Sequence, residues 1–131
     1  MKISMDEIRL INALENLTGV SAKDCIIEEN IISFLVNEKE IGKAIGKNAV
    51  NVKELESKLK KRIEIIGFYK KPENIIKNSF EVKLKEVKKK GDKLIISLDP
   101  LEKKRLFSNT GRLRRIKILI ERNYKNNLIL N

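Results

Sequence analysis

The sequence contains no histidine and no tryptophan, and Cys25 is its one cysteine. A single cysteine cannot form an internal disulfide, and without histidine a zinc or haem site would have to be built from carboxylates alone. The chain also lacks a nucleophile paired with a base, and it has no glycine-rich loop of the P-loop type. We therefore expect no metal, no cofactor and no enzymatic activity.

Aromatic residues and long apolar runs are scarce too. Four Phe and two Tyr are few for the exposed stacking platforms on which RRM and OB domains bind bases. No apolar run approaches the roughly 18 residues that span a membrane. The N-terminus, MKISMDEIRL, has neither a signal-peptide nor a transit-peptide pattern. We expect a globular cytoplasmic protein with no membrane partner.

Positive charge is abundant and unevenly distributed. The net charge is +11, with acidic residues in excess over residues 1–38 and basic residues in excess over residues 39–70 and 71–131. Localised positive charge attracts polyanions and releases their counterions on binding. We therefore predict a nucleic-acid partner, and charge alone leaves both RNA and DNA open.

The N-terminal segment has the pattern of an amphipathic helix. Ser4 and Glu7 form a capping box, and apolar residues then recur at helical spacing until Gly19. We predict a helix over residues 5–18 that ends at this glycine.

A β-hairpin is expected next. Residues 25–28 and 31–36 are rich in β-branched side chains and flank a short polar turn. Because Cys25 opens the first of these apolar stretches, we expect its thiol to be buried as a small hydrophobe. Alternate residues of the second stretch share one strand face: Ile32, Phe34 and Val36.

Two helices and a third strand complete the first half. A short helical stretch starts at Glu38, and an amphipathic helix runs from about Val52 to Lys61, with the small-residue loop 46–49 between them. The third strand is expected over residues 63–66.

The second half repeats this order. We predict a helix over residues 72–80, a strand from Val82, a turn at residues 90–92 and a strand over residues 93–98. The remaining elements are a short helix with Asp99 as its N-cap, a helix over residues 112–122 and a strand over residues 127–130. In the longer helix one apolar stripe is expected to lie in the core: Ile116, Leu119 and Ile120.

The spacing of the two halves indicates a duplication. The small-residue loops begin at residues 46 and 108, and the strands after them begin at residues 63 and 128, so the repeating unit has about 65 residues. We predict an α+β fold with two domains, the first over residues 1–70 and the second over residues 71–131.

The most specific string is IGKNAVNVK, residues 45–53, a small-residue loop between two helices with one lysine inside it and another on the following turn. It resembles the GXXG loop of KH domains, and its wording is close to that of NusA-like transcription factors, particularly the short archaeal kind composed of two KH domains. The resemblance covers essentially the whole chain. It implies two tandem type II KH domains of order α-β-β-α-α-β, each with a three-stranded sheet covered on one face by helices.

The resemblance also implies how the loops work. Glycines let the backbone come close to a nucleic acid, and the helix that follows offers its N-terminal amides to phosphate, so that KH loops clamp about four nucleotides. Lys47 and Lys53 would contact phosphate, and Asn48 tolerates an unusual backbone conformation. The chain departs from the family pattern at Ala49, in place of the second glycine of the first loop, and at Ser108, in place of the first glycine of the second loop.

The implied RNA contacts form one set at each loop: Ile45, Gly46, Lys47, Asn48, Ala49, Asn51 and Lys53 at the first, and Ser108, Asn109, Thr110, Gly111, Arg112 and Arg115 at the second. Arginines near the second loop can grip phosphate or stack on bases. The implied partners are single-stranded RNA and RNA polymerase, in transcription termination or antitermination. We expect the protein to be a monomer.

Two other functions remain open. The duplicated domains could serve as a docking scaffold for the transcription or ribosome-assembly machinery with little RNA binding of their own. A KH fold can also bind single-stranded DNA, which a comparison of matched RNA and DNA oligomers would detect.

Overall fold

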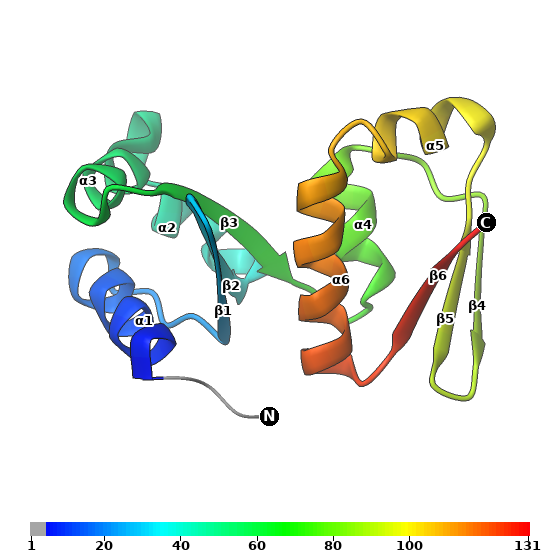
Figure 1. Ribbon diagram of the computed structural model, residues 1–131, viewed down its shortest axis with the longest axis horizontal. Helices are drawn as coiled ribbons and strands as arrows, with labels where there is room; N and C mark the ends of the chain where they lie inside the picture. The colour runs from blue at the N-terminus through cyan, green and yellow to red at the C-terminus, as the bar shows by residue number, and fades with distance from the viewer. Residues whose placement is uncertain (1–4) are drawn as a thin grey trace. The chain divides into compact units, whose positions relative to one another are not determined.

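The structure, a computed structural model, describes residues 5–131 (Figure 1). The chain divides into two compact units, unit 1 with Met1–Phe68 and unit 2 with Tyr69–Asn131. Each unit has helices and strands in the order α-β-β-α-α-β, and unit 1 adds two short 3-10 turns. This confirms the predicted α+β fold class. The capping role predicted for Ser4 lies outside the described residues.

Unit 1 builds a three-stranded sheet in the order β1-β2-β3, in which β1 and β2 are antiparallel and β2 and β3 are parallel. The register pairs Cys25 with Phe34 and Phe34 with Ile65. Its elements are α1 (Met5–Thr18), β1 (Asp24–Glu28), β2 (Ile31–Asn37), η1 (Glu38–Glu40), α2 (Ile41–Ile45), η2 (Lys47–Ala49), α3 (Val50–Leu59) and β3 (Arg62–Phe68).

The core of unit 1 lies between this sheet and its helices. Each of the three α-helices contributes one fully or almost fully buried side chain: Leu14 from α1, Ala44 from α2 and Leu55 from α3. The predicted strand face of Ile32, Phe34 and Val36 is buried in the same cluster, together with Cys25. Helix α1 ends as expected at Gly19, whose φ is +77° and whose N–H donates to the Glu15 carbonyl at 2.8 Å.

Unit 2 has the same topology, with strand order β4-β5-β6, an antiparallel first pair and a parallel second pair. Figure 1 shows α4 and α6 on one side of this sheet. The predicted stripe of Ile116, Leu119 and Ile120 is fully buried. Its elements are α4 (Glu73–Phe80), β4 (Glu86–Lys90), β5 (Lys93–Ser97), α5 (Pro100–Leu106), α6 (Thr110–Tyr124) and β6 (Asn127–Leu130).

Three local predictions in unit 2 differ from the structure in detail. The strand expected from Val82 starts at Glu86, because the N–H of Val82 is bonded to the Lys77 carbonyl at the end of α4. Asp99 is the N-cap residue of α5, as predicted, but its carboxylate makes no capping hydrogen bond and instead pairs with Lys85 at 3.7 Å. Helix α6 begins at Thr110, two residues before its predicted start.

Candidate nucleic-acid interface

The first loop has an unusual backbone. Gly46, Asn48 and Ala49 all have positive φ, at 81°, 55° and 60°. A left-handed conformation costs a residue with a Cβ about 1–2 kcal/mol, and asparagine is among the side chains that tolerate it best. Asn48 therefore adopts the unusual backbone conformation that it was predicted to tolerate. Ala49 also has the left-handed geometry, at the position where the KH pattern has glycine.

Gly46 is required at its position for two reasons. Its φ favours glycine, and a Cβ placed on it would lie 2.9 Å from Nδ2 of Asn51 and 3.0 Å from Cγ1 of Val50. The same Nδ2 of Asn51 donates to the Lys43 carbonyl at 3.1 Å and so ties the first turn of α3 to α2. Asn51, which was predicted as an RNA contact, therefore supports the loop through its packing against Gly46 and its bond to α2.

The start of α3 is open to an acceptor from outside the helix. The N–H of Val50, its first residue, donates to the Lys47 carbonyl, but the N-cap is Ala49, which has no side chain to accept from the amides that follow. The first amides of a helix need an acceptor, and together with the positive end of the helix dipole they favour an anion. The backbone therefore has the local geometry that phosphate binding uses.

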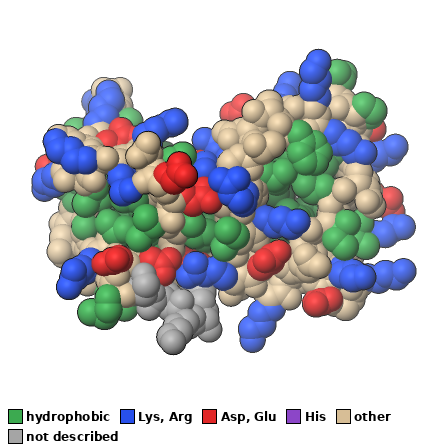
Figure 2. Space-filling view, in the orientation of Figure 1, with side chains coloured by type: hydrophobic (Ala, Val, Ile, Leu, Met, Phe, Trp, Pro, Cys, Tyr) green, Lys and Arg blue, Asp and Glu red, His purple; other side chains and the backbone are tan. Residues whose placement is uncertain are grey.

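Two lysines belong to this helix start, and a third lies on α2. Lys47 and Lys53, both predicted phosphate contacts, are exposed, and so is Lys43, whose Nζ lies 3.4 Å from the Cβ position of Gly19 at the end of α1. None of the three forms an ion pair with any residue in the range 5–131. Sequence reasoning missed Lys43, although the repeated Gly-Lys dipeptides at residues 42–43 and 46–47 were a usable signal. In Figure 2, Lys and Arg side chains crowd the part of unit 1 that α3 forms.

Apolar surface accompanies the charge. Val50, the first residue of α3, is 55% exposed although it is aliphatic, and Ile45 at the end of α2 is half-buried. Ile45 was a predicted contact and Val50 was not. An exposed aliphatic side chain beside lysines offers a contact for a base or ribose, which carbon-rich faces of nucleotides can use.

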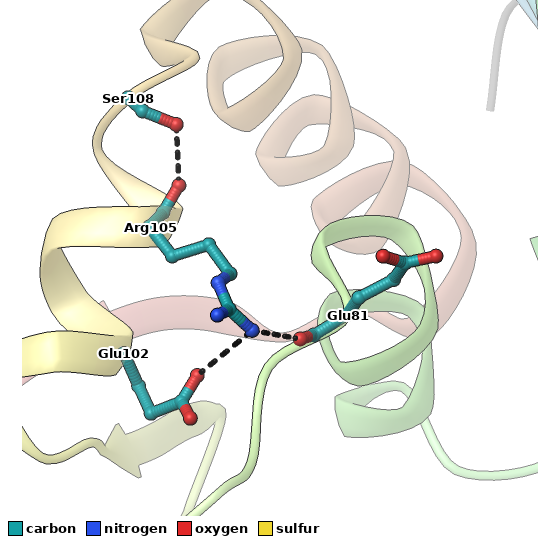
Figure 3. Close-up of polar contacts among 4 residues, drawn as sticks. All are labelled: Glu81, Glu102, Arg105 and Ser108. Atoms are coloured by element: carbon teal, nitrogen blue, oxygen red, sulfur yellow. Dashed lines mark hydrogen bonds and ion pairs between the residues drawn. The ribbon is translucent and has the colours of Figure 1, made fainter.

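The second loop is built differently. None of residues 108–111, all of which are described, has positive φ, and Thr110 and Gly111 already belong to α6. Asn109 caps this helix, because its Oδ1 accepts the N–H of Arg112 at 3.1 Å. The hydroxyl of Ser108 donates to the Arg105 carbonyl at 2.6 Å (Figure 3). No side chain caps the start of α3 in unit 1, whereas the side chain of Asn109 caps the corresponding helix α6 in unit 2.

The arginines near the second loop lie in different environments. Arg115 is only 4% exposed, and its Nη1 lies 3.2 Å from the place that a Cβ on Gly111 would occupy. Arg112 is half-buried and Arg105 is exposed. Arg115 therefore presents almost no surface to a ligand, and Gly111 leaves the room that its guanidinium fills.

A helix that crosses a membrane must be both long and apolar. In the part of the chain that it describes, no helix has both the length and the hydropathy needed to cross a bilayer.

The chain is similar to known proteins over most of its length. The KH domain family matches residues 9–92. The chain is 29% identical over 117 residues to the probable transcription termination protein NusA of Methanocaldococcus jannaschii, covering 86% of this chain and 64% of that protein. It is 34% identical over 99 residues to the protein of the same name from Methanococcus vannielii, covering 73% of this chain and 57% of that one. It thus spans less than two thirds of either relative.

Among solved structures, the crystal structure of APE1850 superposes with a TM-score of 0.82 at 28% identity, covering 98% of this chain and 100% of that one. The fold likeness thus extends over both units, and the family match includes the first loop. The chain therefore belongs to the KH domain family and is similar to archaeal proteins named as NusA.

Proposed function

We propose that the chain binds single-stranded RNA through the loop of unit 1 and acts with RNA polymerase in transcription termination or antitermination. One observation supports the RNA-binding part: a loop with three positive-φ residues leads into a helix without a side-chain cap, and the exposed Lys47 and Lys53 there form no ion pair with residues 5–131. The link to transcription rests on the relatives named as transcription termination proteins. A cytoplasmic location and a monomeric state belong to the same proposal.

The mechanism follows from the loop's geometry. Gly46 lets the RNA backbone approach closely, the amides that follow Val50 in the first turn of α3 bind a phosphate oxygen, and Lys47 and Lys53 supply positive charge. Asn48 and Ala49, both in the left-handed conformation, form the turn that leads into this helix. Because phosphate carries most of the affinity, binding should depend steeply on salt.

Unit 2 contributes a second set of RNA contacts in this proposal. We assign residues 1–70 to KH domain 1 and residues 71–131 to KH domain 2. The remaining predicted contacts, Ser108, Asn109, Thr110, Gly111 and Arg112, form the RNA-facing edge of domain 2, and Gly111 leaves room for the buried guanidinium of Arg115.

The test is the binding of labelled single-stranded RNA, with matched DNA oligomers, at several salt concentrations. Lys47→Glu and Lys53→Glu should each weaken RNA binding, and the slope of log affinity against log salt should fall by about 0.7 for each phosphate that the variant no longer neutralises. Lys58→Glu is the control, because it makes the same charge change at the other end of α3, where Lys58 pairs with Glu54 at 3.7 Å.

Equal effects of all three reversals would mean that the loop has no special role. No RNA binding by the intact chain would leave the docking scaffold as the function, and binding to RNA polymerase would then be measured directly. Tighter binding to DNA than to RNA would move the proposal to single-stranded DNA.

A further inference from the structure

Unit 2 contains an open cavity of about 360 Å³ that the first loop has no part in. It lies between the C-terminal end of α4, the end of α5 and the start of α6, and no residue of the sheet lines it. A volume of this size is within the range of small-ligand sites and is ample for one nucleobase with its ribose.

Two arginines line the cavity and donate to carbonyls at the end of α4. Nη1 of Arg105 donates to the Glu81 carbonyl at 3.0 Å, and it also lies 4.0 Å from the Glu102 carboxylate (Figure 3). Nη1 of Arg112 donates to the Ser79 carbonyl at 3.3 Å. These contacts orient two flat guanidinium groups beside the cavity, and such planes stack well on bases.

Two asparagines supply hydrogen-bonding groups from different elements. Asn78 uses its Nδ2 to donate to the Asn74 carbonyl at 2.9 Å, and Asn109 uses its Oδ1 to accept the Arg112 N–H. Within residues 5–131 this leaves Oδ1 of Asn78 and Nδ2 of Asn109 without a partner. One acceptor and one donor thus line the same cavity, and Phe80 adds an apolar lining.

We propose that this cavity holds one unstacked base of the single-stranded RNA whose backbone unit 1 binds. The amide groups of Asn78 and Asn109 read the base edge, and the guanidinium groups stack on its face. A base fits better than a phosphate, because both arginines already donate to carbonyls at the negative end of α4. The proposal rests on the proposed RNA binding and adds base preference to it.

Free nucleotides test the cavity directly, because the signals that are followed belong to residues that line it. The side-chain amide signals of Asn78 and Asn109 in the NMR spectrum of the intact chain are followed during titration with AMP, CMP, GMP, UMP and, as the control without a base, ribose 5-phosphate. We expect both signals to shift with at least one nucleotide and not with ribose 5-phosphate. Asn126 is the internal control, because its amide lies near Asp92 in the β4-β5 turn. No shift at millimolar nucleotide, or an equal shift with ribose 5-phosphate, overturns the proposal.

Variants of the intact chain then connect the cavity to RNA. Asn78→Ala should weaken binding of the preferred homopolymer by about fivefold, the loss of one hydrogen bond, and should reduce the difference between homopolymers. Arg105→Gln should weaken binding more than Lys104→Gln, which removes the same charge from the neighbouring position of α5, outside the cavity.

Two results separate this proposal from the proposed function. If base preference survives Asn78→Ala and the two α5 variants behave alike, while Lys47→Glu still weakens binding, the cavity proposal fails and RNA binding by unit 1 stands. If the Lys47 and Lys53 reversals have no effect but the cavity variants do, the proposed role of the first loop fails instead.

Discussion

The hydroxyl of Tyr124 bonds to both backbone groups of Tyr69. It accepts the Tyr69 N–H at 3.1 Å and donates to the Tyr69 carbonyl, across 55 positions of sequence. Tyr69 directly follows the last residue of β3, and Tyr124 is the last residue of α6. One side chain therefore fixes the start of unit 2 to the end of its longest helix.

Tyr124→Phe removes this hydroxyl and keeps the ring. We expect the free energy of unfolding to fall by about 1–3 kcal/mol, because two backbone groups lose their partner in a half-buried site. Urea denaturation of the intact chain measures the change. An unchanged free energy of unfolding would mean that water replaces the hydroxyl at no cost.

Ala49→Gly should stabilise the protein. The left-handed conformation of Ala49, with φ of 60°, penalises a Cβ, so glycine should raise the free energy of unfolding by about 0.5–1 kcal/mol. The control is Ala13→Gly within α1, where glycine should lower stability by about the same amount. The same sign for both variants would contradict the strained backbone at Ala49.

Gly46→Ala should destabilise the first loop. A methyl group there meets Asn51 at 2.9 Å in addition to the positive φ, so we expect a loss of about 2 kcal/mol or more and weaker RNA binding. Gly42→Ala is the matched control: no atom lies within 4 Å of its Cβ position, and it belongs to α2. That variant should be neutral or more stable, as thermal melting would show.

Arg115→Gln should affect stability more than RNA binding. The side chain is 4% exposed, so its loss should lower the free energy of unfolding by about 1–3 kcal/mol, while the salt dependence of RNA binding stays the same. Arg114→Gln, on the exposed side of α6, should do the reverse. A reduced salt slope for Arg115→Gln would restore it as a direct RNA contact.

Much of the fold could be predicted because the signals are local. The periodicity of residues 5–18, the β-branched hairpin and the repeated loops set the element order of both units, and the stripe of Ile116, Leu119 and Ile120 was expected in the core. The first loop was found by its small residues and lysines. Where prediction missed an element's start, as at Glu86 and Thr110, hydrogen bonds between residues at a helix end decided the boundary.

The sequence by itself determined the helix and strand order, the positive charge and the chemical groups of the first loop, since each depends on neighbouring residues. Only the tertiary structure decided which of those groups face outward. Arg115 is buried because it lies one helical turn before Leu119 on the face of α6 that packs into the core. Arg105 and Glu81, or Tyr69 and Tyr124, meet only after distant segments pack together, because such pairings depend on the whole fold and not on local spacing.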